Sequence, residues 1–351
     1  MATTPVSPAL AGLDDRDHRI KFILAYTAVC LIWGSTYLGV RFAIETLPPI
    51  LMAGVRFTIA GCIMFVWAKI AGAQMPTLGE VRSAGIVGIL LVTVCNGLFT
   101  LAMGSVPSSI GALVATSLPI WMVLLDWLRP NGSRPHNGVL AGVALGFGGI
   151  ILLVRPWEVF FGAGGASGGA QTTSHSASAH AVDMFGAGIM CIGTIGWAVG
   201  SIIARQVKLP SSPQMNTAVQ LLVGGVVMLV WGLLRGELAN VHPENFSLKS
   251  LLAFVYLIIF GSIAAFTAYS WLLRNVSAAL ASSYTYINPI VAIVLALTLG
   301  GERITATMLL AMAIIMLAVA VIARYRNRPV HDTNTEPAAH VSTSTLVEEG
   351  A

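Results

Sequence analysis

Charged residues are scarce in this sequence. Of its 351 residues, 10% are charged and 56% are hydrophobic, and the mean hydropathy is +0.81. Soluble globular proteins carry about 25% charged residues, so this deficit excludes an ordinary soluble domain and indicates a chain surrounded by lipid. We therefore expect the lipid bilayer and a small-molecule substrate as its partners, and no nucleic acid.

The residue patterns of metalloenzymes and nucleotide-driven pumps are also missing. None of the seven histidines lies in an apolar run, and the four cysteines form no CxxC pair. Cysteines without such a pair usually behave as small buried hydrophobic residues. The sequence contains neither a P-loop nor an HExxH motif. We expect a protein that is not an enzyme and that needs no cofactor and no metal.

What the sequence has instead is ten long apolar runs. A membrane helix needs about 20 such residues. The fold class that these runs predict is an all-α membrane protein with ten transmembrane helices. The runs fall near residues 22–42, 50–70, 83–103, 108–128, 138–154, 184–204, 215–235, 250–272, 278–299 and 306–324.

Lysine and arginine are distributed unevenly between the two ends of these helices. With the N-terminus placed inside, 13 of them fall on inner segments and 5 on outer segments. This positive-inside bias predicts that both termini are cytoplasmic in a multi-pass protein of the cell (inner) membrane.

The two halves of the chain resemble each other. At an offset of 164 residues Trp33 aligns with Trp197, and at an offset of 170 Pro119 aligns with Pro289. Because each half has an odd number of spans, equivalent helices cross the membrane in opposite directions, as in two inverted five-helix repeats. The predicted organisation is a disordered cytoplasmic N-terminus (1–21), a first repeat (22–154), a Gly/Ser-rich external linker (155–183), a second repeat (184–324) and a disordered cytoplasmic tail (325–351).

Three motifs carry a resemblance to a known family. They are LIWGSTY in the first helix, PPILMAGVRFTIAG in the second, and SSYTYINPIVAIVLALTLGGERIT from the ninth helix into the tenth. With them, residues 22–324 resemble the drug/metabolite transporter superfamily, specifically its EamA-type ten-helix exporters. The resemblance implies a gradient-driven exporter of small metabolites, with four helices of each half around a central cavity and the fifth and tenth outside. The first half departs from the pattern, because Gly132 stands where the second half has Glu302.

An Asn-Pro pair lies inside the ninth apolar run. Pro289 frees the carbonyl four residues before it, and lipid offers no water to satisfy that group. The sequence therefore predicts a hinge at Pro289, with the same break at Pro119, and Asn288 in the substrate cavity; a simple packing kink is the alternative. Tyr284 and Tyr286 are two residues apart and cannot face one direction, so we expect one of them to meet the substrate.

Arg56 is the only cation well inside an apolar run, and its counterpart in the repeat is Gln220. Intramembrane ionisable residues usually face the interior of the bundle. Arg56 is therefore a candidate for holding a substrate carboxylate or gating the outer half. The alternative is that it pairs with Glu45 or with helix ends near the interface.

Aromatic residues complete the list of cavity candidates. Trp33 and Tyr37 in the first helix and Trp197 in the sixth stand near hydroxyl residues, which suits amphipathic or planar organic substrates, although a packing seam would look the same. Further candidates are Asn96 in the third helix and Tyr269 in the eighth.

Acidic groups that could couple transport to protons are few. Asp126 is the only acid within a span, near the inner end of the fourth helix. It is a candidate coupling acid, and a solvated interfacial acid is the other interpretation. Glu302 is the second candidate, although the first turn of the tenth helix also favours an acid there for structural reasons.

The leading hypothesis is a secondary transporter that exports small organic metabolites, such as amino acids, their analogues or drugs, by alternating access. An uncoupled facilitator or channel and a non-transporting membrane sensor or scaffold remain as alternatives. The sequence leaves the substrate and the oligomeric state open.

Overall fold

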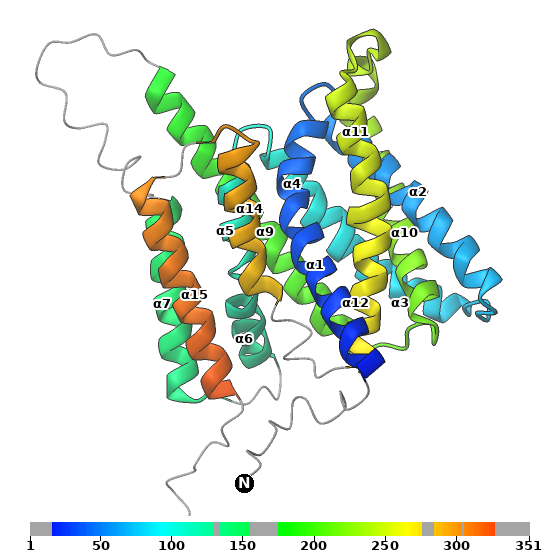
Figure 1. Cartoon of the computed structure of the whole chain (residues 1–351), viewed down its shortest axis with the longest axis horizontal. Helices are drawn as coiled ribbons and strands as arrows, with labels where there is room; N and C mark the ends of the chain where they lie inside the picture. The colour runs from blue at the N-terminus through cyan, green and yellow to red at the C-terminus, as the bar shows by residue number, and fades with distance from the viewer. Residues whose placement is uncertain (1–15, 130–133, 155–174, 276–283, 303–304, 327–351) are drawn as a thin grey trace, which may run out of the picture.

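The computed structural model describes residues 16–129, 134–154, 175–275, 284–302 and 305–326, and these residues form helices, turns and short connections without a strand (Figure 1). The elements are α1 (Arg16–Ala43), α2 (Pro49–Ile70), α3 (Leu78–Gly88), η2 (Ile89–Asn96), α4 (Gly97–Ala102), α5 (Ser108–Ala115), α6 (Leu118–Leu128), α7 (Asn137–Val154), α9 (His175–Ala204), α10 (Pro213–Leu234), η4 (Glu237–Asn240), η5 (Pro243–Asn245), α11 (Leu248–Tyr256), η6 (Leu257–Ala264), α12 (Ala265–Asn275), α14 (Tyr284–Thr298) and α15 (Ala306–Arg326).

Alone or joined end to end with their neighbours, many of these helices form stretches long enough to cross a bilayer. Among the described residues, eight helical stretches are apolar over at least 18 residues, and two shorter apolar stretches, Asn137–Leu153 and Ile287–Thr298, accompany them. Local signals fix several of the ends. At the start of α3, for example, Thr77 and Glu80 form a capping box, in which each side chain accepts a hydrogen bond from the other residue's backbone N–H.

Several segment boundaries differ from the expected ones. α1 begins at Arg16, so the expectation of disorder up to residue 21 is wrong for its last six residues. With 28 residues, α1 is about 42 Å long at about 1.5 Å per residue, which exceeds the roughly 30 Å of hydrocarbon and carries its first turns beyond the membrane.

The boundary between the expected linker and the second repeat also differs from the prediction. α9 begins at His175, inside the segment expected to be a linker, and α15 ends at Arg326, just inside the expected tail. α14 is described from Tyr284 onward. The remaining residues of the expected terminal segments and linker, and residues 276–283, lie outside the described part of the chain.

The two prolines expected to act alike behave differently. The fourth apolar run is split between α5 and α6, and Pro119 is the second residue of α6. At the break, the hydroxyls of Thr116 and Ser117 donate to the carbonyls of Ala112 (2.9 Å) and Val114 (2.6 Å), which also accept the backbone N–H groups of Thr116 and Ser117. Pro289, in contrast, lies within the continuous helix α14.

Helices α2 and α10 pack closely through glycine. A Cβ atom on Gly61 would lie 2.8 Å from the backbone nitrogen of Leu222, and one on Gly225 would lie 2.7 Å from the backbone nitrogen of Thr58. Small residues at such contacts let two backbones approach in lipid, where helix association depends on van der Waals packing.

Helices α7 and α15 form a pair at one side of the molecule (Figure 1). Gly142 and Gly149 of α7 lie against Ile322 and Ile315 of α15, where an added Cβ would meet the isoleucine side chains at 2.8 and 2.7 Å. The other helices surround the centre of the molecule, where the candidate site lies.

Candidate functional site

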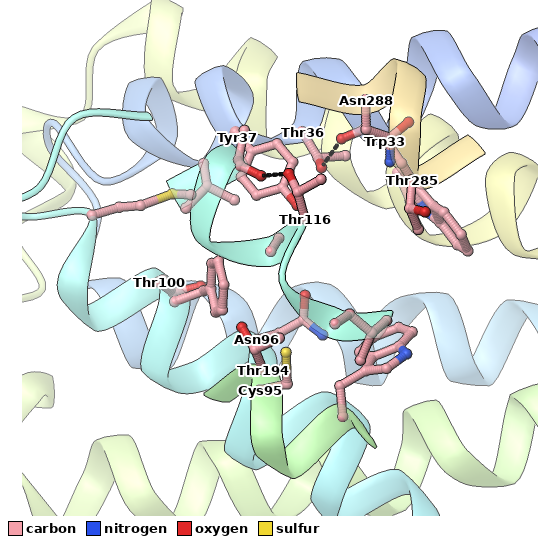
Figure 2. A pocket seen from close by; sticks show the side chains of 18 of the residues that line it. Trp33, Thr36, Tyr37, Cys95, Asn96, Thr100, Thr116, Thr194, Thr285 and Asn288 are labelled. Carbon is pink, nitrogen blue, oxygen red and sulfur yellow. Dashed lines mark hydrogen bonds between the residues drawn. The ribbon is translucent and has the colours of Figure 1, made fainter. Parts of the chain in front are cut away.

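A cavity of about 150 Å³ lies at the centre of the bundle. Its walls come from α1, α2, η2, α4, α5, α6, α9, η6, α12 and α14, and no lining residue comes from the described residues of α7, α10 or α15. Figure 2 shows Asn96 and Thr194 on one side of this space and Asn288 and Thr285 on another. The cavity is therefore shared between elements of both halves of the chain.

One wall of the cavity is aromatic and is built around Trp33. The indole Nε1 of Trp33 donates to the carbonyl of Gly261 (3.3 Å), which holds the ring in place. The rings of Phe266, Tyr269 and Tyr284 lie 4.9–5.4 Å from it, measured between centroids. At these separations, tilted and edge-on pairs are favourable, so the wall is a rigid apolar surface for a ligand.

Asn288 links this wall to α1. In the amide orientation that satisfies its neighbours, Nδ2 of Asn288 donates to the carbonyls of Cys30 (3.1 Å) and Tyr284 (3.2 Å). The side chain is 8% exposed and lies next to Pro289, where the backbone of α14 loses a hydrogen bond. The Asn-Pro pair thus combines a proline that weakens α14 with an amide that ties α14 to α1.

Among the residues that the structure describes, Arg56 is the only charged one that lines the cavity. Its side chain is 5% exposed, its Nε donates to the hydroxyl of Ser262 (3.0 Å), and its Cζ lies 4.5 Å from the centroid of the Phe57 ring. Among the described residues no acid forms an ion pair with Arg56. The carboxylate of Glu45, the partner considered from the sequence, instead binds Lys249 at 2.6 Å.

Two π-helical segments, one from each half, contribute residues to the cavity. η2 contributes Cys95 and Asn96, and the side chain of Asn96 donates to the carbonyl of Leu91 (2.8 Å), five residues earlier. η6 contributes Gly261 and also carries Ser262, the residue that binds Arg56. Such wide turns are rare and occur frequently at functional sites; here they bring backbone carbonyls and small polar groups to the cavity.

Beyond the cavity, two carboxylates cap helices that lie far away in the sequence. Glu302 accepts four hydrogen bonds at the start of α5, from the backbone N–H and the hydroxyl of both Ser108 (2.8 and 2.6 Å) and Ser109 (3.2 and 2.6 Å). Glu237, which is 5% exposed, accepts from the backbone N–H groups of Ile50 and Leu51, both at 2.9 Å, at the start of α2. Both carboxylates belong to the second half of the chain, and both helices belong to the first.

The hydrogen bonds at Glu302 also set its protonation. Burial alone would raise the pKa of the Glu302 carboxyl, but the bonds from Ser108 and Ser109 outweigh it, so this pKa lies below its ordinary value of 4.5. Negative charge at the N-terminus of a helix is favourable in addition. Glu302 therefore serves α5 and not, as expected from the sequence, the first turn of its own following helix.

Comparison with known proteins identifies the family. The profile of the EamA-like transporter family matches residues 20–155 and again residues 184–324. The chain is 36% identical over 299 residues to the uncharacterized inner membrane transporter YedA of Escherichia coli K12, covering 85% of this chain and 89% of YedA. The chain belongs to the EamA-like transporter family.

More distant similarities agree with this assignment. The chain is 24% identical to protein PecM of Dickeya dadantii, covering 85% of this chain and 90% of that protein. It is 23% identical to the uncharacterized transporter YvbV of Bacillus subtilis, covering 87% and 91%. A solved crystal structure that is 20% identical, with a TM-score of 0.55, covers 88% of this chain and 99% of that one, which shows a shared fold. Family and relatives therefore point to a membrane transporter rather than an enzyme.

In this EamA-like transporter, most candidates from the sequence meet at the cavity. The candidates that line it are Trp33, Tyr37, Arg56, Asn96, Trp197, Tyr284, Asn288 and Pro289. Tyr269 supports the aromatic wall without lining the cavity. The side chain of Tyr286 lies outside the described part of the structure.

The other candidates lie elsewhere. Gln220 does not line the cavity: its amide donates to Asn216 (3.0 Å), and its backbone packs against Gly88. The carboxylate of Asp126 in α6 is exposed and pairs with Arg129, the residue that follows the helix. Proline 119 itself is not a lining residue, although its neighbour Leu118 is.

Sequence reasoning missed most of the threonines of the cavity. Thr100, Thr116 and Thr194 line it, and Figure 2 shows Tyr37 and Thr116 pointing toward one another. A usable signal existed for one of them, because Thr116 lies one helical turn before Pro119. The other two look like ordinary small residues of a membrane helix.

Proposed function

We propose that this protein is a secondary transporter that exports small organic metabolites by alternating access through the central cavity. The observation that carries the proposal is the cavity itself: it is lined by elements of both halves, and α7 and α15 stand apart from it. A site shared by two halves can be exposed to one side of the membrane and then the other when the halves move against each other.

An inverted repeat of ten helices underlies this mechanism. The family profile matches the chain twice, and π-helical segments occur in the third helix of the first half and the third of the second. In Figure 1, α1 rises from the lower end while α9 descends from the upper end.

Packing between the halves supports the same symmetry. Gly61 and Gly225 are 164 residues apart, as are Thr58 and Leu222. Gly61 packs on Leu222, and Gly225 packs on Thr58. This reciprocal contact is what a two-fold relation between α2 and α10 produces.

The upper end of the bundle in Figure 1 supplies a gate. There Glu302 and Glu237 of the second half hold the first turns of α5 and α2, and the hydroxyl of Ser250 donates to the carbonyl of Phe42 at 2.7 Å. These bonds join the two halves, so the cavity cannot open to this side without breaking some of them. With both termini cytoplasmic in the inner membrane, as the positive-inside rule predicts, this end is the outer one.

The prolines fit the role of hinges below this gate. Pro119 separates α6 from α5, so α5 with its cap can tilt independently of α6. Pro289 removes one backbone bond from α14 beside the cavity. Movement at these two sites would release the upper ends of both helices.

Coupling of transport to protons would need a titratable group that moves with the substrate. Among the described residues no acid lines the cavity, and the exposed pair of Asp126 with Arg129 lies away from it. A proton carrier would therefore be Glu302 or a group of the substrate. Uncoupled facilitated export is the second candidate, and the absence of a lining acid from the described residues favours it.

Binding and transport can be tested together. The purified protein would be screened by thermal unfolding in detergent against amino acids, nucleosides, carboxylic acids and cationic drugs, because a ligand of the folded state raises its stability. Any hit would then be tested for counterflow in proteoliposomes. Trp197→Ala should lose both signals, whereas Trp127→Ala, at an exposed tryptophan of α6, should keep them. A ligand that stabilises the protein but shows no counterflow would favour a sensor over a transporter.

A further inference from the structure

The guanidinium of Arg56 has N–H groups that form no hydrogen bond with a described residue. Its Nε is taken by Ser262, but neither terminal nitrogen of the guanidinium has a hydrogen bond to a described residue, and the side chain lines the cavity. The carboxylate of Glu45 binds Lys249 instead. A buried charge without an ion-pair partner is costly, and such residues in membrane proteins usually face an interior cavity and mark a pathway.

The chemistry of the guanidinium selects the missing partner. Its planar fork of N–H donors matches the two oxygens of a carboxylate, and hydrogen bonds between charged groups are the strong ones. A cation would be repelled by Arg56, and no described lining residue carries a negative charge that could hold an ammonium group. The remaining polar groups are hydroxyls and amides, such as Thr36, Thr100 and Asn96.

The volume of the cavity further restricts the class of ligand that it can hold. Pockets for drug-sized ligands have about 300–1,000 Å³, whereas this cavity has about 150 Å³. Aromatic side chains, including Trp33, Phe99 and Trp197, form much of its wall. Such a space suits a compact apolar or planar group attached to one charged end.

We infer that the transported substrates are small monocarboxylates, whose carboxylate binds the terminal nitrogens of Arg56 while a compact apolar part lies against the aromatic wall. This inference rests on the proposed function and names the substrate class for it. It excludes cationic drugs, which the sequence had left open. It also disfavours zwitterions, because their ammonium group would find no acid among the described lining residues.

The test uses three probes that share one ring and differ in charge: benzoate, benzamide and benzylamine. Their dissociation constants would be measured near neutral pH from the tryptophan fluorescence of the purified protein. We expect the wild type to bind benzoate about tenfold to a hundredfold more tightly than benzamide, the range that one or two bonds to a charged group provide. Benzylamine should bind more weakly than either.

Variants assign the preference to Arg56. Arg56→Gln should bring the benzoate-to-benzamide ratio close to one, and Arg56→Lys, which keeps the charge without the fork, should give an intermediate ratio. Arg82→Gln, at an exposed arginine of α3, should leave the ratio unchanged. Because Arg56→Gln removes an unpaired buried charge, it should also fold at least as stably as the wild type, which thermal unfolding would check.

Several results would overturn the inference. They are equal binding of benzoate and benzamide by the wild type, tighter binding of benzylamine, no binding of any probe at millimolar concentration, and a preference for benzoate that persists in Arg56→Gln. None of these results decides the transport proposal, because ligand-induced stabilisation and counterflow with the Trp197→Ala control are measured on a chemically broader panel. A neutral or cationic hit there would remove the carboxylate class and keep the cavity.

Discussion

Replacing Glu302 by Gln should increase the fraction of molecules in which the upper end of the bundle is open. The carboxylate accepts four hydrogen bonds from Ser108 and Ser109, two of them from backbone N–H groups at the first turn of α5. The amide of Gln keeps one accepting oxygen, so about half of these donors lose their acceptor. The hydroxyls can rotate toward other groups, but a backbone N–H cannot.

The magnitude follows from the lost bonds. A hydrogen bond to a charged group contributes about 1.5–3 kcal/mol, and loss of a helix N-cap costs about 0.5–2 kcal/mol. For the one backbone donor left without an acceptor in Glu302→Gln, a cost of about 2 kcal/mol is reasonable. Since 1.4 kcal/mol corresponds to a factor of ten, the ratio of upper-open to upper-closed molecules should rise about 30-fold.

The cavity contains its own reporter for this change. Cys95 lines the cavity, so a variant with Cys30, Cys62 and Cys191 replaced by Ala keeps a single cysteine at the site. In proteoliposomes of known orientation, the rate at which a membrane-impermeant maleimide labels Cys95 from the upper face follows the open fraction. We expect this rate to rise about 30-fold with Glu302→Gln, in line with the shift worked out above.

A matched control separates the gate from general loosening. Glu45→Gln removes the ion pair with Lys249, which also joins the two halves but is exposed; such pairs contribute about 0–1 kcal/mol, so labelling should change by no more than about fivefold. Ser109→Ala, which removes one hydroxyl donor, should be intermediate. Unchanged labelling in Glu302→Gln, or an equal rise in Glu45→Gln, would refute the role of the α5 cap as a gate.

Three further predictions concern stability, measured by thermal unfolding in detergent. Because the pKa of Glu302 is lowered in the folded state, its contribution is complete above the unfolded value near 4.5 and is lost as the pH falls through the folded value; the difference between wild type and Glu302→Gln should therefore shrink below about pH 4.5, and a constant difference would contradict this. Gly61→Ala should lose about 1–3 kcal/mol by overpacking, whereas Gly148→Ala, whose Cβ meets nothing within 4 Å, should gain up to about 1 kcal/mol of helix propensity; the same sign for both would argue against the close contact. Asn288→Ala should lose about 1–3 kcal/mol because two carbonyls lose their donor, while Thr298→Ala, at the exposed end of α14, should be near neutral.

The helices could be predicted because lipid imposes a simple rule. A spanning helix must be about 20 residues long and apolar, and the long runs show this directly. The ends of the helices were harder to predict from the sequence. The capping box of Thr77 and Glu80 lets α3 begin five residues before its apolar run. α1 likewise starts before its apolar run, because a helix that leaves the membrane continues on polar residues such as Arg16 and Asp17.

Residues of the cavity could be predicted where a side chain has a high free energy in lipid. The side chains of Arg56 and Asn288 are unfavourable in lipid, and both residues line the cavity. Gln220 was chosen only because it aligns with Arg56, and a repeat preserves the backbone more faithfully than the role of a side chain; α10 presents Gln220 to α3 and not to the cavity. The partners of Glu302 are 193 and 194 residues away in the chain, and no local pattern could have indicated them.

The hydrogen bonds that hold the upper end closed do not follow the two-fold relation between the halves. This asymmetry bears on the direction of transport. Both carboxylates that cap a helix of the opposite half come from the second half, and the residues aligned with Glu237 and Glu302 in the first half are Ala73 and Gly132, which cannot accept a hydrogen bond through a side chain. The N-terminus of α10, the counterpart of α2, is capped by its own Ser212. Among the described residues, the carboxylates that cap a helix of the opposite half thus lie at one end of the transporter, whereas the pair of Glu80 with Lys208 (3.4 Å), which also joins the halves, leaves the Lys208 side chain exposed. The two access states should then differ in free energy, with closure of the upper end favoured in the absence of substrate. If that end is the outer one, the resting cavity is available to the cytoplasm, which is the arrangement an exporter needs to load its substrate.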